Sequence, residues 1–163
     1  MTWEERNEQR LSVIYPPLVH RVRNFLADMN RHGISVLVTA GLRTYAEQDA
    51  LYAQGRTAPG PIVTRARAGY SSHNFGLAVD VAPDDVDTPG LQIDWDARQP
   101  EWKTLVFMVR CNRLNSGITF GDRPHIYLEE LHDTPTQEMR DLLAAGGLPA
   151  VWTHVNAILG IEN

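Results

Sequence analysis

The sequence predicts an α+β fold, in which a small antiparallel sheet is flanked by helices. Segments with helical periodicity and short segments with strand periodicity follow one another in an irregular order. The 163 residues are enough for one domain with a sizeable core. Because repeats, low-complexity tracts and linkers are absent from the sequence, we expect residues 1–163 to form a single domain.

The first half of the chain reads as helix, strand and helix. Residues 17–32 form an amphipathic pattern that Gly33 ends, and 34–39 is a strand-like apolar run. A second helix is expected over about 45–54, because Thr44 and Glu47 form a capping box before it and Gly55 follows it. The expected apolar face of the first helix contains Leu18, Val22, Phe25, Leu26 and Met29.

The second half supplies two more strands and three helices. Leu77–Ala82 and His125–Leu128 show the alternation of strands. Pro100 is expected to begin a helix that reaches about residue 113 and buries Leu105, Val106 and Val109. Another helix is expected to begin at 134–137 and end at Gly146 and Gly147, and a short last helix to span about 149–159.

Composition excludes several classes of protein. The formal net charge of −5 argues against nucleic-acid binding, which usually needs a basic patch. No apolar run near 18 residues stands out, so we expect no membrane insertion, and the polar, acidic residues 1–8 do not resemble a signal peptide. The single cysteine, Cys111, excludes an internal disulfide and is expected to be a buried, inert thiol.

The chemically most informative stretch is Ser71–Asp80, S-S-H-N-F-G-L-A-V-D, which Asp122–His125 follows as D-R-P-H. His73, Asp80 and His125 offer two imidazoles and a carboxylate, and catalytic zinc typically takes three such protein ligands and leaves one position for water. Asp122 offers a further carboxylate that could accept a proton from that water. The pattern therefore predicts a zinc hydrolase with one Zn²⁺ per chain.

The strand pattern around these residues supports the same prediction. Alternation would place Asp80 between Ala78 and Ala82 on one face, where small neighbours leave room for an ion. Gly76 allows the bend that brings His73 back over this strand. In the later strand, His125 would share a face with Tyr127.

Other candidates are weaker. His20, His32, His132 and His154 are interpreted as ordinary histidines. The arginine-containing loop 55–70 reads equally well as a wall of the cleft and as a solvated loop. The acidic segment 83–98 could bind calcium but lacks the EF-hand spacing, so a solvated loop is favoured.

These motifs resemble those of the zinc D-Ala-D-Ala carboxypeptidase family, whose superfamily includes the hedgehog signalling domain. The branch of L-alanyl-D-glutamate endopeptidases, many of them phage endolysins, is the most similar. The resemblance spans roughly residues 10–130. It implies that His73, Asp80 and His125 are the zinc ligands and that Asp122 is the catalytic base.

The resemblance extends to the substrate side of the site. The segment 40–57, A-G-L-R-T through L-Y-A-Q-G-R-T, matches the family segment whose arginine contacts substrate, which is Arg43 here. Arg43 could stabilise the carbonyl oxygen during hydrolysis or hold a substrate carboxylate, and Ser71 could bind substrate or support the turn. Ile126 stands where many relatives have an aromatic residue.

The resemblance implies a monomeric zinc metallopeptidase that cuts the L-alanyl-D-glutamate bond of the peptidoglycan stem peptide. With no signal peptide and no separate cell-wall-binding domain, the protein is expected to be an endolysin. It would be made in the host cytoplasm and would reach the wall after the membrane is permeabilised. The alternatives are a D-Ala-D-Ala carboxypeptidase or dipeptidase of the same family and a non-catalytic zinc-containing binding domain.

Overall fold

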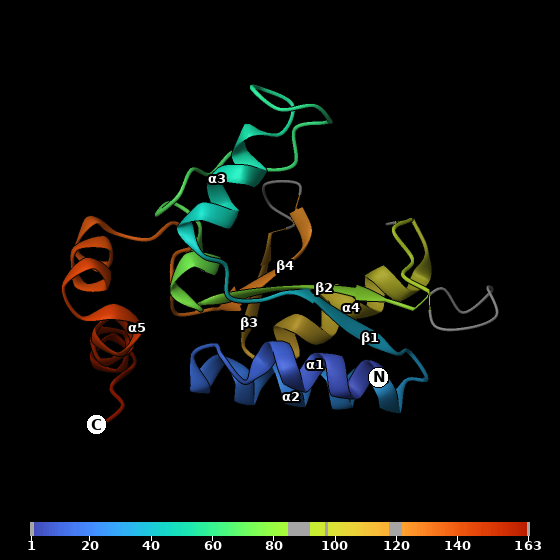
Figure 1. Cartoon of the computed structure of the whole chain (residues 1–163). Coiled ribbons are helices and arrows are strands. Elements are labelled where there is room, and N and C mark those ends of the chain that lie inside the picture. Colours follow the sequence, from blue (N-terminus) through green and yellow to red (C-terminus); the bar gives the residue numbers. More distant parts are fainter. Residues whose placement is uncertain (1, 85–91, 97, 118–121, 163) are drawn as a thin grey trace.

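The computed structural model describes residues 2–84, 92–96, 98–117 and 122–162, without the side chains of residues 122 and 123. Its centre is a four-stranded antiparallel sheet with the order β1-β2-β4-β3 (Figure 1). The strands are β1 (Val36–Ala40), β2 (Ala78–Pro83), β3 (Leu114–Gly117) and β4 (Asp122–Leu128). The α+β fold with an antiparallel sheet is therefore as the sequence predicts.

Helices cover one face of the sheet and leave the other face partly open. In Figure 1, α1 (Trp3–Leu11), α2 (Pro16–Arg31) and α4 (Pro100–Cys111) lie below the sheet, and α3 (Tyr45–Ala53) lies above it. The apolar faces of α2 and α4 pack against one another and against the strands, and of the expected residues only Leu26 and Val106 stay partly exposed. Fully buried members of this cluster include Leu18, Val22, Phe25, Met29, Leu105 and Val109.

Helix α1 was not expected from the sequence, yet it protects the free edge of β1. Its buried Asn7 donates a hydrogen bond to the Val36 carbonyl (2.9 Å) and accepts one from the Val38 amide (2.7 Å). Backbone groups at the edge of a sheet need such partners. The sequence signal for this helix is the capping box of Thr2 and Glu5, which the structure contains.

The expected C-terminal pair of helices is present as two segments of α5 (Gln137–Leu159), separated at Gly147. The backbone there is non-helical, with φ 68° and ψ −165°, and Pro149 follows two residues later. By length and composition, α5 is the one described helix that could span a membrane, although no such apolar stretch was expected. Because the break divides it, neither segment has the roughly 20 residues that a membrane span needs.

One smaller expectation was wrong, and one strand was missed. Cys111 is exposed, because it is the last residue of α4 and lies away from the face that carries Leu105 and Val109. Strand β3 was not expected, because the polar sequence of Leu114–Gly117 has little strand periodicity and is ordered by pairing with β4.

Candidate metal centre

Two neighbouring strands carry the centre. Asp80 in the middle of β2 pairs directly with His125 of β4 in the antiparallel register. Alternation along β2 sends Val79 and Val81 into the core and leaves the Asp80 carboxylate on the opposite face. On β4, His125 shares that face with Tyr127, and their rings lie 5.8 Å apart.

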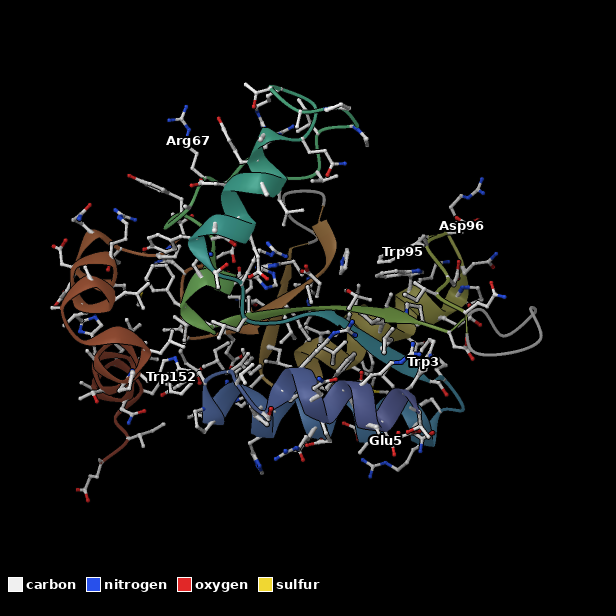
Figure 2. The ribbon with its side chains drawn as sticks, in the orientation of Figure 1. Trp3, Glu5, Arg67, Trp95, Asp96 and Trp152 are labelled. Carbon is white, nitrogen blue, oxygen red and sulfur yellow. The ribbon has the colours of Figure 1, made fainter. Side chains whose placement is uncertain are left out.

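His73 comes from a short 3₁₀ helix, η1 (Ser72–Phe75), that folds back over β2. The turn ends at Gly76, whose φ of 66° lies in the left-handed region that favours glycine. Trp152 of α5 packs against Gly76 and donates a hydrogen bond to the Phe75 carbonyl (2.9 Å; Figure 2). The C-terminal helix therefore fixes the turn that presents His73.

Three donor atoms form an almost equilateral triangle. His73 Nε2, Asp80 Oδ1 and His125 Nδ1 lie 3.2 Å apart in each of the three pairs. A tetrahedral zinc with N and O ligands at about 2.0–2.1 Å places its ligand atoms about 3.3–3.4 Å apart. The triangle therefore fits three corners of a zinc tetrahedron.

The outer partners of the two histidines direct the correct nitrogens inward. His73 Nδ1 lies 2.8 Å from the Gly41 carbonyl, which can only accept, so this nitrogen carries the proton and Nε2 presents a lone pair. His125 Nε2 lies 2.5 Å from Asp133 Oδ1, which leaves Nδ1 to face the triangle. Such outer hydrogen bonds are the usual support of metal-binding histidines.

Asp133 was missed by the sequence reasoning. It lies beyond β4 in an irregular segment, where no periodic pattern marks it. The Ser72 hydroxyl donates to Asp133 (2.8 Å) and also lies 3.3 Å from His125 Nε2, so η1 and β4 are joined behind the centre. An acidic residue eight positions after a candidate ligand was the available signal, and it was too weak to use.

The charges around the triangle favour a bound cation. Burial would raise the pKa of Asp80, but the charges and hydrogen bonds of His73 and His125 hold it well below its ordinary value. Burial would lower the pKa of His125, but hydrogen bonds to Asp133 and Asp80 raise it to about 9. In the metal-free protein a proton on His125 therefore supplies positive charge that a bound metal ion would otherwise supply.

Arg43 lies at the rim of the centre. Its Nη2 is 3.6 Å from Asp80 Oδ2, and its Nη1 donates to Gln48 Oε1 (2.9 Å). Gln48 is fully buried and also donates to the Ala66 carbonyl (2.8 Å), so it connects Arg43 to the loop 55–70. Asn74 adds a hydrogen bond to the Arg43 carbonyl (2.8 Å), and the guanidinium is thus held beside the triangle.

The side chain of Asp122 lies outside the described residues, so its role stays a prediction. Its backbone begins β4 and pairs with Gly117, whereas the preceding pair is Ser116 with Ile126. Three additional β4 residues are therefore accommodated between consecutive pairs. This irregularity means that simple strand alternation does not fix the face of Asp122.

The remaining candidates from the sequence are not members of the triangle. The hydroxyl that reaches His125 and Asp133 belongs to Ser72, and a substrate role for Ser71 stays a prediction. Within the described part of the chain, the triangle is the one group of three potential metal-ligating side chains. His20, His32, His132 and His154 are not members of that group. The same holds for the described acidic residues of 83–98, of which 85–91 and 97 lie outside the description.

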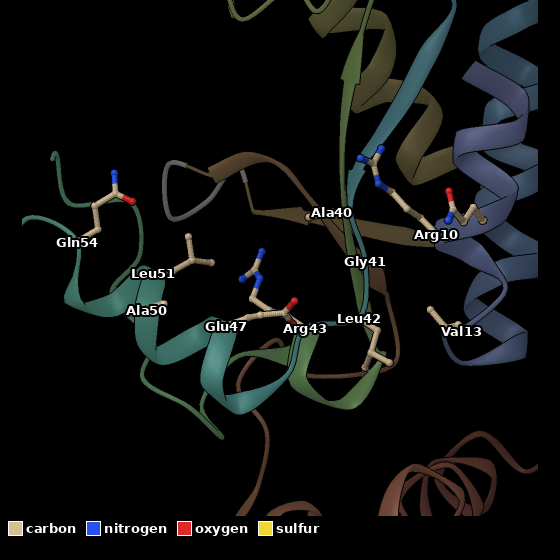
Figure 3. A pocket seen from close by; sticks show the side chains of 11 residues that line it. Arg10, Val13, Ala40, Gly41, Leu42, Arg43, Glu47, Ala50, Leu51 and Gln54 are labelled. Carbon is tan, nitrogen blue, oxygen red and sulfur yellow. The ribbon is translucent and has the colours of Figure 1, made fainter. Parts of the chain in front are cut away.

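A groove of about 750 Å³ adjoins the centre (Figure 3). It lies between α1 and α3 and is floored by the end of β1 and residues 40–43. Arg43 connects the groove with the centre, because it lines the groove and lies 3.6 Å from Asp80. The loop 55–70 does not line this groove, and its Arg67 stacks over Tyr52 and points outward (Figure 2).

Comparison with known proteins identifies the family. A family model described as VanY, D-alanyl-D-alanine carboxypeptidase, matches residues 12–106, which is more than half of the chain. The chain belongs to the VanY family. The matched segment contains Arg43, His73 and Asp80, whereas His125 lies beyond it and joins the centre through the pairing of β4 with β2.

Two similar proteins share a more specific description. Over 101 residues the chain is 40% identical to the peptidoglycan L-alanyl-D-glutamate endopeptidase CwlK of Bacillus subtilis (strain 168). This match covers 58% of the chain and 60% of CwlK. The L-Ala D-Glu endopeptidase ChiX of Serratia marcescens has the same fold, with a TM-score of 0.52 and 24% identity over 76% of this chain and 86% of ChiX.

Proposed function

We propose that this VanY-family protein is a zinc-dependent peptidoglycan peptidase that hydrolyses the L-alanyl-D-glutamate bond of the stem peptide. The observation that carries the metal assignment is the 3.2 Å triangle of His73, Asp80 and His125 donor atoms. The 40% identity with CwlK supports the choice of bond. The proposal therefore adds a specific metal and a specific substrate bond to what membership of the family shows.

His73 Nε2, Asp80 Oδ1 and His125 Nδ1 would hold the zinc. When bound, zinc polarises a carbonyl group and lowers the pKa of water to about 7. Arg43 would bind the substrate carbonyl oxygen and stabilise the negative charge that develops there, or would instead hold a substrate carboxylate. Gln48 and Asn74 hold the arginine in position, so little reorganisation is needed during the reaction.

Asp122 is proposed as the general base. Its carboxylate would accept a proton from the attacking water and deliver it to the leaving amine. Asp133 has a different role in this proposal: it hydrogen-bonds to the outer nitrogen of His125 and fixes the ring, so it is a positioning residue.

The test is digestion of purified peptidoglycan with zinc-loaded protein, followed by mass spectrometry of the new N-termini. New N-terminal D-glutamate is expected, and a chelator should prevent its appearance. His125→Ala should be inactive, and His20→Ala, at an exposed position of α2, is the matched control that should retain activity. Digestion that is unaffected by chelator would refute the metal proposal.

The second candidate is D-Ala-D-Ala carboxypeptidase activity, which the description of the matching family model favours. Its product is free D-alanine, which the same digest would reveal. Release of D-alanine without new D-glutamate N-termini would assign the chain to this activity. If zinc binds in stoichiometric amount and neither product forms, the chain is a non-catalytic zinc-containing domain.

A role as a monomeric phage endolysin also remains a proposal. Expression of the protein in a bacterial cytoplasm should leave cells intact until the inner membrane is permeabilised, and lysis should then follow. Lysis should fail with His125→Ala in the same experiment. Sedimentation of the purified protein at the mass of one chain would support the monomer.

A further inference from the structure

The groove between α1 and α3 is a feature of the described structure that the metal centre leaves unexplained. Its volume of about 750 Å³ lies in the range of small-ligand sites. Its apolar lining includes Val13, Leu42, Ala50 and Leu51, and Val13 is 49% exposed although it is apolar. A groove of this kind beside a catalytic centre can hold a part of the substrate that does not react.

The groove contains two guanidinium groups and one carboxylate. Arg10 extends from α1 toward β1, and Arg43 rises between β1 and α3 (Figure 3). The carboxylate of Glu47 is already held by the backbone amide and the hydroxyl of Thr44 in the capping box. Glu47 stays ionised, so the two guanidinium groups and one carboxylate leave the lining side chains with a net positive charge.

Arg10 is the more informative of the two cations. It is partly buried, and its Nη1 donates to the Val38 carbonyl at the edge of β1. No described carboxylate forms an ion pair with Arg10, in contrast to Arg21, Arg23 and Arg113. Its remaining donors are thus available to an anion, and a guanidinium binds carboxylates in a planar, two-pronged geometry.

We propose that this groove binds the leaving side of the stem peptide, and that Arg10 binds a carboxylate of that side. This inference rests on the proposed cleavage between L-alanine and D-glutamate. D-Glutamate supplies the leaving amine and has two carboxyl groups, only one of which can continue the chain. Negative charge therefore lies on the leaving side, whereas L-alanine contributes no side-chain charge on the other side.

Arg10 lies outside the segment that establishes membership of the family. The family model matches residues 12–106, so the wall that α1 (Trp3–Leu11) contributes to the groove lies outside the matched segment. Arg43, by contrast, lies inside the match and beside the centre. The role of Arg10 is therefore inferred from the groove of this chain and not from membership of the family.

The test compares two synthetic substrates on zinc-loaded protein. One is an N-acetylated L-alanyl-D-glutamyl-L-lysine with free carboxylates, and the other has carboxamides in their place. Arg10→Gln should lower kcat/KM for the free acid about tenfold, through KM, as expected for loss of a partly exposed charged hydrogen bond. It should leave the carboxamide unchanged, and Arg10→Lys should recover part of the loss.

The matched control is Arg6→Gln, one turn earlier on α1, because Arg6 is exposed and does not line the groove. Because Arg10 also supports β1, general damage would lower kcat/KM for both substrates equally, and that result would overturn the inference. So would an unchanged preference for the free acid in Arg10→Gln.

Failure of the proposed function gives a different result, namely no cleavage of either substrate by the wild-type protein. The groove is then tested by fluorescence anisotropy with labelled copies of the two peptides. Tighter binding of the free acid, lost in Arg10→Gln and kept in Arg6→Gln, would support the subsite. Equal binding of the two peptides would overturn the proposed subsite, because it would show that the groove does not recognise negative charge.

Discussion

Replacing Asp133 tests the support behind the metal centre without touching a ligand. Asp133 Oδ1 lies 2.5 Å from His125 Nε2, and the Ser72 hydroxyl donates to the same oxygen. Carboxylates in this position typically contribute about 10–100-fold to metal affinity. Because the contact is short and charge-assisted, we expect Asp133→Ala to weaken zinc binding about 100-fold, or about 2.7 kcal/mol.

Asparagine provides an intermediate case. Asp133→Asn keeps an oxygen that can accept from His125 Nε2 but removes the negative charge, so we expect a loss of about tenfold, or about 1.4 kcal/mol. Zinc affinity would be measured by competition with a chromophoric chelator. Asp141→Asn is the matched control, because Asp141 is an exposed acid on α5 that bonds only to Gln137 among the described residues.

The reasoning would be refuted if Asp133→Ala bound zinc as tightly as Asp141→Asn does. The far-ultraviolet circular dichroism of each zinc-loaded variant should match the wild type, which separates a change at the centre from a loss of fold. An equal weakening by both variants would point to a general effect of net charge and would also count against the assignment.

Three further predictions follow from the same geometry. The affinity for zinc should fall as the pH falls below about 9, by up to about tenfold per pH unit, because the metal must displace the proton of His125. The affinity would be measured by chelator competition across pH 6–8, and an affinity that does not change with pH would contradict the prediction. Asp122→Asn should lower turnover by about 10²–10⁴-fold while zinc content stays at the wild-type level; loss of zinc, measured by atomic absorption, would instead make Asp122 a ligand. Gln48→Leu should destabilise the fold by about 1–3 kcal/mol in urea unfolding, because it removes the hydrogen bonds of the buried Gln48 side chain to Arg43 and to the partly buried Ala66 carbonyl; an unchanged midpoint would contradict the role of Gln48.

The sequence was most informative where local pattern and chemistry coincided. Alternation over residues 77–82 was enough to separate Asp80 from the core side of its strand, and the capping box at Thr44 was enough to begin α3. The glycine pair before Pro149 correctly divided the C-terminal helix. In each case a few neighbouring residues determine the feature, so tertiary structure was not needed to find it.

The features that were missed depend on contacts between distant residues. Asp133 matters only because β4 places His125 beside it, and β3 exists because β4 pairs with it. Arg10 gains its position from the packing of α1 on the edge of β1. A periodic pattern in one sequence does not report such contacts, which explains why the candidate ligands were predicted and the residues that support them were not.

The central claim is that His73, Asp80 and His125 bind one zinc ion through the nitrogen and oxygen atoms that face one another. It is tested most directly by anomalous diffraction at the zinc absorption edge from a crystal of the zinc-loaded protein. We predict one strong peak about 2.0–2.2 Å from His73 Nε2, Asp80 Oδ1 and His125 Nδ1. A peak bonded to His125 Nε2, or a zinc ion held elsewhere while this triangle stays vacant, would contradict the claim.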